Sequence, residues 1–172
     1  EQAIESAHSG HTQHALCYLD LDQFKIVNDT CGHVAGDELL KQLTHQLHGK
    51  VRAGDMLARL GGDEFGVILE NCDQSTAYRV ADGLRQSIKD FRFVWQDRFF
   101  DIGVSIGLVP ITATSGNMTE VLSAADSACY VAKDQGRNRV HIYQPNDDAL
   151  ARRHGEMQWV QRINDGLEEN RF

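Results

Sequence analysis

The chain lacks the features of several common classes of protein. It has no internal repeat, no low-complexity tract and no Gly-x-x-x-x-Gly-Lys-Ser/Thr phosphate-binding loop. It also has no signal peptide and no apolar run long enough to span a bilayer. These absences predict a soluble, cytoplasmic domain that makes no direct contact with a membrane, and any phosphate group that it binds must be held in another way.

Positive charge is also scarce. The 172 residues include 17 Lys and Arg against 25 Asp and Glu, which gives a net charge of −8. Proteins bind the nucleic-acid backbone through clustered Lys and Arg, so this balance argues against a nucleic acid as the partner. The same balance makes a local metal ion more necessary if the chain holds a triphosphate.

The cysteines are few and far apart, which favours reduced cytosolic thiols over a disulfide framework or a zinc site. Several histidines are spaced three residues apart, a spacing that can place them on one helix face. Because no cysteine or carboxylate completes a coordination set near them, we interpret them as solvated polar positions: His8, His11, His14, His45 and His48.

The most informative segment that is present covers residues 59–65, Arg-Leu-Gly-Gly-Asp-Glu-Phe. Both flanks alternate as strands do, with Met56, Ala58 and Leu60 on one face before the glycines and Phe65, Val67 and Leu69 alternating after them. Gly61-Gly62 can supply a tight two-residue reversal. The pattern predicts a β-hairpin that carries Asp63 and Glu64 at its tip, although the segment taken alone is more typical of a solvated turn.

A second acidic group follows a predicted buried strand. Residues 15–19 form a short apolar run that ends in Asp20-Leu21-Asp22. If this strand lies beside the hairpin, Asp20 and Asp63 approach one another, and two such charges about 4 Å apart repel by roughly 4 kcal/mol at an effective dielectric of about 20. A shared divalent cation removes that cost. Because Mg²⁺ prefers carboxylate oxygens together with substrate phosphates, the pattern predicts a metal-dependent nucleotide site.

A helix is predicted immediately after this acidic strand end, over residues 23–29. A second, amphipathic helix follows from about residue 32, with an apolar stripe of Leu39, Leu40, Leu43 and Leu47. The free backbone N–H groups at the start of the first helix, from about Gln23 to Lys25, would cradle a polyphosphate, and Lys25 adds a positive charge.

The rest of the chain completes one α+β fold. Apolar positions predict a helix over residues 77–88, strands over 91–95 and 102–108, a helix over 121–129 and a last strand over 139–143. Gly103, Ser105 and Gly107 leave one face of the second strand small, which permits close packing by the helix over 121–129. The order of elements indicates a palm-like, mainly antiparallel central sheet flanked by helices.

Several separate motifs, in order along the chain, resemble the GGDEF family of diguanylate cyclases. They are Asp20-x-Asp22-x-Phe24-Lys25-x-x-Asn28-Asp29, Gly32-His33-x-x-Gly36-Asp37, Arg59-x-Gly61-Gly62-Asp63-Glu64-Phe65, Ser105-Ile106-Gly107 and Ala124-Ala125-Asp126-x-Ala128-x-Tyr130-x-Ala132-Lys133-x-x-Gly136-Arg137-Asn138. The resemblance covers about residues 14–143. It also implies the cyclase- or polymerase-palm-like architecture of that family.

The resemblance implies a reaction in which two GTP molecules condense to cyclic di-GMP and two pyrophosphates. Each domain holds one GTP, so catalysis requires a homodimer in which two sites face each other. The implied ligands of Mg²⁺ or Mn²⁺ are Asp20, the carbonyl of Leu21, Asp63 and Glu64. The implied catalytic residues are Asp63, as a proton acceptor, Glu64 beside it, and Lys25, which stabilises charge on the phosphorus.

Four further residues are implied to contact the nucleotide. Asp37 and Asn28 match the family residues that read guanine, whose adjacent N–H donors suit a carboxylate, and Phe24 and His33 belong to the same pattern. Two alternatives remain open from the residues alone. Asp37 could serve first-turn helix electrostatics, and His33 could orient its loop.

Lys133 and Arg137 resemble the family's clamp on the terminal phosphates. Being four residues apart near a helix end, they are expected on one face of that helix. The alternative is a cationic helix C-terminus, which interacts favourably with the helix dipole.

An inhibitory site for the product is suggested by Arg52-Ala53-Gly54-Asp55. In family members that cyclic di-GMP inhibits, an Arg-x-x-Asp motif stands at this spacing before the hairpin. Arginine can stack on guanine and pair with phosphate, while the aspartate accepts guanine donors. A surface ion pair at a strand start is the alternative.

The resemblance also suggests how the chain is organised. We expect residues 1–13 to be the remnant of an upstream helix, residues 14–144 to be the GGDEF domain, and residues 145–172 to be a linker helix, with a stripe of Val160, Ile163 and Leu167, towards an EAL-like phosphodiesterase domain of a hybrid signalling protein. One rival interpretation is a catalytically silent module that binds GTP or cyclic di-GMP and controls its neighbour. Another is a metal-dependent nucleotide hydrolase, which would not explain the guanine-reading pair.

Overall fold

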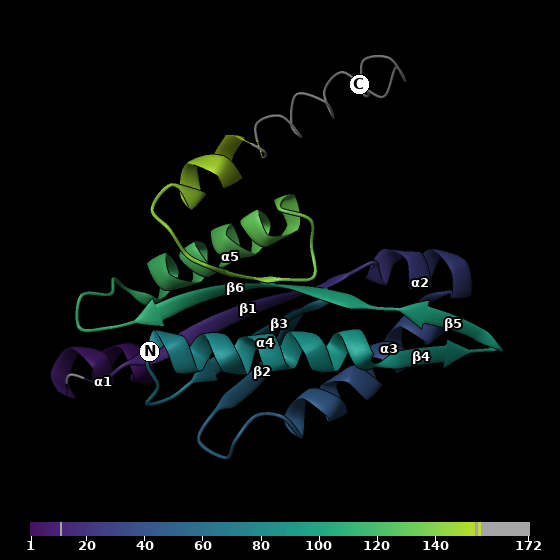
Figure 1. The fold of residues 1–172 in the computed structure, drawn as a ribbon, viewed down its shortest axis with the longest axis horizontal. Helices are drawn as coiled ribbons and strands as arrows, with labels where there is room; N and C mark the ends of the chain where they lie inside the picture. The colour runs from purple at the N-terminus through teal and green to yellow at the C-terminus, as the bar shows by residue number, and fades with distance from the viewer. Residues whose placement is uncertain (11, 154, 156–172) are drawn as a thin grey trace.

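A five-stranded sheet with strand order β2-β3-β1-β6-β7 forms the centre of the molecule (Figure 1). The computed structural model describes residues 1–10, 12–153 and 155. Neighbouring strands are antiparallel except for β6 and β7, which are parallel. The predicted α+β class with a mainly antiparallel sheet is therefore confirmed. The strands of this sheet are β1 (His14–Asp22), β2 (Met56–Gly61), β3 (Glu64–Leu69), β6 (Gly103–Ile111) and β7 (Val140–Ile142).

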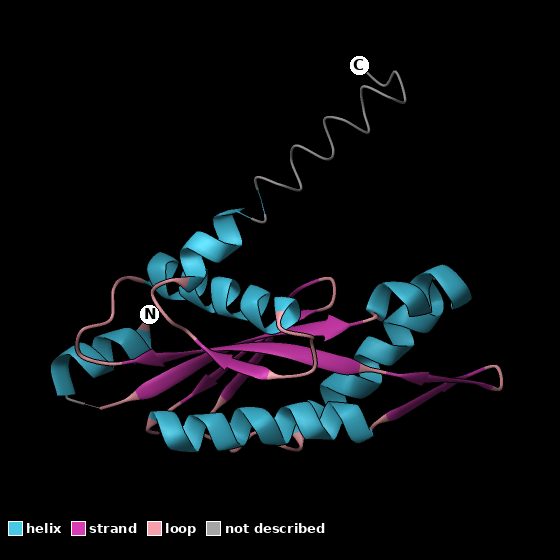
Figure 2. Ribbon diagram, turned by 45° about the horizontal axis from the view of Figure 1, so that its top comes forward, coloured by secondary structure: helices cyan, strands magenta, loops and turns pink. Residues whose placement is uncertain are grey.

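Helices cover both faces of the sheet (Figure 2). One core cluster packs α3 and α4 against the sheet, and the other packs α1 and α5 against its opposite face. Within the described ranges, no helix is both long and apolar enough to cross a bilayer. The labelled helices are α1 (Gln2–Gly10), α2 (Phe24–Cys31), α3 (His33–His48), α4 (Gln74–Asp90) and α5 (Met118–Asp134), and residues 147–153 are also helical. The predicted stripe of Val160, Ile163 and Leu167 lies outside the described residues.

Strand β1 positions the acidic residues because successive side chains of a strand point to opposite faces. Cys17, Leu19 and Leu21 lie in the core under α3 and α4. Leu16 belongs to the cluster under α1 and α5. The alternation therefore places Asp20 and Asp22 on the face that α5 covers.

The hairpin of β2 and β3 forms as predicted, but its turn and its outer strand differ from the prediction. Gly61 pairs with Glu64, so the two-residue loop is Gly62-Asp63, and the register shifts between Arg59 and Gly61. Gly62 has a φ of 49°, which a glycine adopts at little cost. The apolar face predicted for β2 is exposed, with Met56 59% and Leu60 46% accessible. The reason is that β2 is the edge strand, whereas α5 lies over β1, β6 and β7.

A second hairpin was only half predicted. The strand expected over residues 91–95 is β4 (Arg92–Trp95), but it pairs with an additional strand, β5 (Arg98–Asp101), outside the main sheet. Its turn is formed by Gln96 and Asp97, with φ values of 47° and 64°. Because no glycine stands in this turn, the sequence gives no strong hairpin signal. Figure 1 shows this hairpin projecting from the body of the molecule.

One histidine is buried rather than solvated. His14 is 4% exposed. Its Nδ1 accepts a hydrogen bond from the N–H of Asn71 at 3.1 Å, and its Nε2 lies 3.1 Å from the hydroxyl of Thr12. It thereby ties the start of β1 to the turn after β3.

The small face of β6 receives α5, as predicted. A Cβ atom added to Gly107 would lie 2.2 Å from the carbonyl oxygen of Ala125 and 2.4 Å from the amide nitrogen of Cys129. Backbone atoms cannot yield as a flexible side chain can, so only glycine allows this approach of helix and strand.

We expect Gly107→Ala to destabilise the domain by about 3 kcal/mol, at the upper end of the usual cost of overpacking. Gly83→Ala is the matched control, because Gly83 lies in α4 with nothing within 4 Å of the added Cβ. That change should stabilise the domain by about 0.5–1 kcal/mol. Urea unfolding of the two variants measures both effects, and equal midpoints would contradict the packing described here.

Candidate active site

The end of β1 and the tip of the β2–β3 hairpin bring three carboxylates together. Asp20 lies directly opposite Glu64 in the antiparallel register. The next residue, Leu21, donates its N–H to the carbonyl oxygen of Asp63 at 3.1 Å. The structure thus places the strand beside the hairpin, with Asp20, Asp63 and Glu64 all half-buried. The direct partner of Asp20 across the sheet is Glu64 rather than Asp63.

The electrostatics of this carboxylate cluster are unfavourable. Burial, the neighbouring Asp20 and, to a lesser extent, Glu64 raise the pKa of Asp63, while a backbone hydrogen bond and Lys133 oppose the shift. Burial and Asp20 likewise raise the pKa of Asp126 on α5, again against the effect of Lys133. The positive charge around the cluster is therefore too small to neutralise its carboxylates.

Lys133, near the end of α5, supplies the positive charge that the cluster has. Its Nζ donates a hydrogen bond to Oδ2 of Asp20, and the two side chains form an ion pair with 31% and 13% exposure. Burial disfavours the charged amine, but the hydrogen bond and charge of Asp20 prevail and raise the pKa of Lys133. The predicted phosphate clamp and a predicted metal ligand are thus bound to each other.

Arg137 does not share a helix face with Lys133, so that part of the prediction was wrong. Helix α5 ends at Asp134, and Gly136 and Arg137 follow with φ values of 116° and 61°. The N–H of Arg137 donates to the carbonyl of Ala132 at 3.1 Å, which closes the end of the helix. A glycine three residues after Lys133 therefore ends the helix before a further turn can form.

Asp22 has a structural position that the sequence did not reveal. It is 6% exposed. Its carboxylate accepts a hydrogen bond from the hydroxyl of Ser105 at 2.8 Å and another from the N–H of Asn138 at 2.9 Å. It thereby joins β1, β6 and the segment after α5. Beside it, the amide oxygen of Asn138 is buried without a hydrogen-bond partner among the described residues.

The helix pair α2–α3 places the predicted nucleotide contacts next to the carboxylate cluster. Helix α2 begins two residues after β1 ends, with Gln23 as its N-cap. Gly36 of α3 faces α2 so closely that an added Cβ would lie 1.9 Å from Oδ1 of Asn28 and 3.3 Å from the ring of Phe24. Gly36 therefore lets these two side chains pack against α3, one residue before Asp37.

The remaining predicted nucleotide contacts are exposed. Lys25, His33 and Asp37 all lie on the surface of α2 and α3. Helix α3 begins at His33, and its first turn contains no acidic residue. Asp37 therefore lies beyond the first turn, so first-turn helix electrostatics does not account for it.

Arg52 and Asp55 form an ion pair, with Nε 3.1 Å from Oδ1. The Arg52 side chain is 57% exposed, whereas that of Asp55 is 3% exposed. Asp55 also accepts the N–H of Glu70 at 3.1 Å, and Arg52 donates to the carbonyl of Glu70. The pair anchors the loop before β2 to the end of β3 and leaves much of the Arg52 side chain accessible.

The donors present at the cluster suit a divalent cation. Three half-buried carboxylates repel one another, and an ammonium group already occupies one of their oxygens. Carboxylate oxygens are the ligands that Mg²⁺ prefers. Across the described ranges, no three His, Cys, Asp or Glu side chains lie in an arrangement that could by itself hold a metal ion. A cation held here would draw its other ligands from the backbone, from water or from a bound phosphate.

Sequence reasoning gave no role to Tyr18. Burial, together with hydrogen bonding to Glu64, raises the pKa of Tyr18, and Asp126 adds to the effect. Tyr18 stands two residues before Asp20, so the period of a strand places it on the same face. Its two-residue spacing from Asp20 was the sequence signal that could have identified Tyr18 as a neighbour of the carboxylates.

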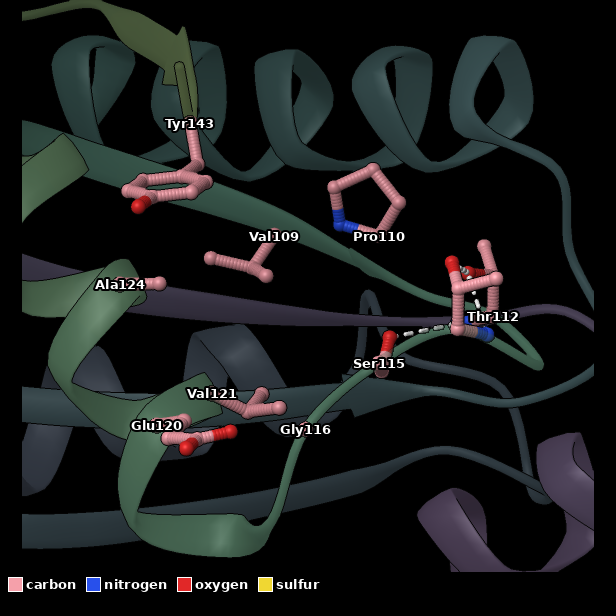
Figure 3. A pocket seen from close by; sticks show the side chains of 10 residues that line it. Val109, Pro110, Thr112, Ser115, Gly116, Glu120, Val121, Ala124 and Tyr143 are labelled. Carbon is pink, nitrogen blue, oxygen red and sulfur yellow. Dashed lines mark hydrogen bonds between the residues drawn. The ribbon is translucent and has the colours of Figure 1, made fainter. Parts of the chain in front are cut away.

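A hollow elsewhere in the molecule does not coincide with the carboxylates. A cavity of about 340 Å³ is lined by residues that include Val109, Thr112, Ser115 and Tyr143. Figure 3 shows these side chains. The cavity lies where β6 ends, whereas Asp20 and Asp22 pair with Ser105 and Gly103 where β6 begins. The carboxylate cluster is thus at the opposite end of β6.

Comparison with known sequences identifies the class of this protein. The family described as "Diguanylate cyclase, GGDEF domain" matches residues 1–139. The chain therefore belongs to the GGDEF family of diguanylate cyclase domains.

Two curated relatives show how the chain compares with whole proteins. It is 42% identical over 146 residues to the probable diguanylate cyclase DgcE of Escherichia coli, and the aligned region covers 85% of this chain and 13% of that protein. It is 41% identical over 159 residues to the cyclic di-GMP phosphodiesterase PdeB of Shewanella oneidensis, covering 91% and 18%. The chain thus corresponds to less than one fifth of either relative.

Solved structures share the fold. The GGDEF domain of PA1120 from Pseudomonas aeruginosa aligns with a TM-score of 0.79 at 32% identity, covering 84% of this chain and 91% of that one. The GGDEF domain of DgcB from Caulobacter crescentus, in complex with c-di-GMP, aligns with a TM-score of 0.76 at 28% identity, covering 82% and 84%.

We expect Asp22→Ala to cost about 2–4 kcal/mol, because it leaves the Ser105 hydroxyl and the Asn138 N–H buried without an acceptor. Asp29→Ala removes an exposed carboxylate of α2 and should change stability by no more than about 0.5 kcal/mol. Chemical denaturation measures both. If Asp22→Ala were as stable as the unsubstituted protein, Asp22 would not be the structural link described above.

Proposed function

We propose that this domain is a diguanylate cyclase that condenses two GTP molecules into cyclic di-GMP and two pyrophosphates. The proposal rests on the cluster of Asp20, Asp63 and Glu64 in a member of this family. These carboxylates are half-buried, lie next to the start of α2 and have too little positive charge around them to neutralise them. Such a cluster suits a metal-bound triphosphate better than it suits a purely structural role.

In this proposal, Mg²⁺ or Mn²⁺ is held by Asp20, Asp63 and Glu64, with the backbone carbonyl of Leu21 as a further donor. When bound, the cation offsets negative charge on the triphosphate and polarises the α-phosphate. Asp63 accepts the proton of the attacking 3′-hydroxyl. Its place at the hairpin tip, beside the proposed cation site, puts it where such a proton would be released.

The surrounding helices hold the nucleotide. Asp37 and Asn28 read the guanine edge, because a carboxylate and an amide oxygen match its N–H donors. The free N–H groups at the start of α2 and the side chain of Lys25 receive phosphate oxygens. Lys133 reaches the terminal phosphates from α5. Phe24 and His33 shape the surface beside the base.

The Arg137 side chain completes the contacts to the terminal phosphates. Its position after the end of α5 differs from that expected of a helical pair with Lys133. The left-handed turn at Gly136 and Arg137 places it in the segment that Asp22 holds through Asn138. We infer that this anchored segment, rather than a helix face, orients the guanidinium group.

The reaction requires two copies of the domain. Each cluster holds one nucleotide, and the 3′-hydroxyl of each must attack the α-phosphorus of the other. The active species is therefore a homodimer with its two carboxylate clusters facing each other. A single copy binds GTP but turns over slowly.

A second function is supported by one observation. A relative that matches 91% of this chain is named a cyclic di-GMP phosphodiesterase rather than a cyclase. In such a protein, a domain of this kind can bind GTP or cyclic di-GMP and control an EAL-like neighbour without synthesis. In this alternative, a linker helix from about residue 145 leads to such a downstream domain.

Incubation with GTP and Mg²⁺, followed by chromatography, tests the proposal. The chain should be assayed alone and fused to a dimerising coiled coil, and the fusion should give the faster synthesis of cyclic di-GMP. Asp63→Asn should reduce that rate by about 100-fold or more, the usual contribution of a general base. Asp97→Asn, at the tip of the β4–β5 hairpin, is the matched control and should retain activity.

The products separate the three interpretations. GTP binding without any product from the dimerised protein would support the silent regulatory module. Release of GDP or GMP would indicate a hydrolase. Either result would overturn the cyclase proposal.

We further propose that Arg52 and Asp55 form an inhibitory site for cyclic di-GMP. The exposed Arg52 side chain is available for guanine or phosphate, while the buried Asp55 holds it in place. Arg52→Ala should weaken product binding by about 10-fold or more, because a hydrogen bond to a charged group contributes about 1.5–3 kcal/mol. Isothermal titration calorimetry measures this. Arg98→Ala, on the β4–β5 hairpin, should bind as the unsubstituted protein does. Unchanged affinity of the Arg52 variant would rule the site out.

A further inference from the structure

The contact between Lys133 and Asp20 joins two residues that the proposed function assigns to different parts of the substrate complex. Asp20 is to hold the divalent cation, whereas Lys133 is to hold the terminal phosphates. In the structure described here, the ammonium group of Lys133 donates directly to Oδ2 of Asp20. The geometry thus pairs a proposed phosphate contact with a proposed cation ligand.

Lys133 faces acidic groups from three elements. These are Asp20 at the end of β1, Asp63 at the hairpin tip and Asp126, two turns earlier on the same face of α5. The charge of Lys133 opposes the rise in the pKa of Asp63 and of Asp126, and its ammonium group is the hydrogen-bond partner of Asp20. Its positive charge therefore stabilises these carboxylates as the charge of a bound metal ion would.

An ammonium group and a divalent cation cannot both occupy this position favourably, because like charges repel strongly in a half-buried site. A metal ion that arrives alone must displace Lys133 from Asp20 and brings no new anion to accept the ammonium group. A metal ion that arrives with a triphosphate brings new anionic oxygens, which can accept the displaced ammonium group.

We propose that Lys133 is the internal counter-ion of the carboxylate cluster and that it transfers to the nucleotide when the metal binds. The inference rests on the proposed function for the identity of the metal and nucleotide. Its consequence is reciprocal coupling: the cation binds weakly by itself and tightly with the nucleotide, and the nucleotide likewise binds more tightly with the cation. Lys133 is thus the residue that makes the site bind the cation and the nucleotide together.

The test measures metal binding without any turnover. Mn²⁺ is titrated into the protein, with electron paramagnetic resonance to follow the free ion, in the absence and presence of a non-hydrolysable GTP analogue. For the unsubstituted chain, the analogue should tighten Mn²⁺ binding by 10-fold or more. Lys133→Met should bind Mn²⁺ alone about 10-fold more tightly than the unsubstituted chain, and the analogue should then tighten Mn²⁺ binding by a smaller factor than it does for the unsubstituted chain.

Three further variants separate this role from a general effect of charge or folding. Lys89→Met removes the same charge from an exposed position on α4 and should leave Mn²⁺ binding unchanged. Lys133→Arg keeps the charge and should restore weak binding of Mn²⁺ alone. Lys133→Gln gives a second neutral side chain if the Met variant does not fold, and circular dichroism checks the fold of each.

The inference fails if the neutral variants bind Mn²⁺ alone no more tightly than Lys89→Met does, or if the analogue tightens Mn²⁺ binding as strongly in them as in the unsubstituted chain. Failure of the cyclase proposal is recognised separately. A chain that makes no cyclic di-GMP can still show the tighter binding of Mn²⁺ alone in the Lys133 variants, and an active cyclase can lack it.

Discussion

Repulsion among carboxylates at the end of β1 is the constraint on which the rest of this structure depends. Antiparallel pairing fixes Asp20 opposite Glu64, and the hydrogen bond from Leu21 to Asp63 holds the hairpin tip against the same strand. The backbone positions of these residues cannot move apart without breaking the register of a central strand that is covered on both faces and paired on both edges. The fold thereby keeps an unfavourable arrangement in place, as functional sites commonly require.

Two aspartates on β1 show how the surroundings decide the role of one residue type. Asp20 and Asp22 point to the same face of the strand. Asp20 is opposite Glu64, has an ammonium group as its partner and is partly accessible. Asp22 is opposite Gly103, which leaves room for its carboxylate to be enclosed by a hydroxyl and a backbone N–H. Asp20 therefore remains available to a ligand, whereas the carboxylate of Asp22 is fully used in joining three elements.

Most of the fold could be predicted from the sequence, because apolar periodicity follows directly from burial. The strand over residues 15–19, the stripe of α3 and the small face of β6 are examples. What could not be predicted depends on partners distant in the sequence. The edge position of β2 exposes Met56 and Leu60, and β5 follows a turn without glycine. The sequence named the three carboxylates that lie together at the end of β1, but the pairing of Lys133 with Asp20 depends on packing between α5 and β1.

Helix α5 is held at several points along its length. Asn117 and Glu120 form a capping box at its start, the thiol of Cys129 donates to the carbonyl of Ser105, and Asp22 holds the segment after its end. A lysine on such an anchored helix can change partners only by rotation about its own side-chain bonds, which is fast on the nanosecond scale. The exchange of cations at this site therefore requires no hinge or lid, and the four-carbon tether of one side chain sets how far the charge can travel.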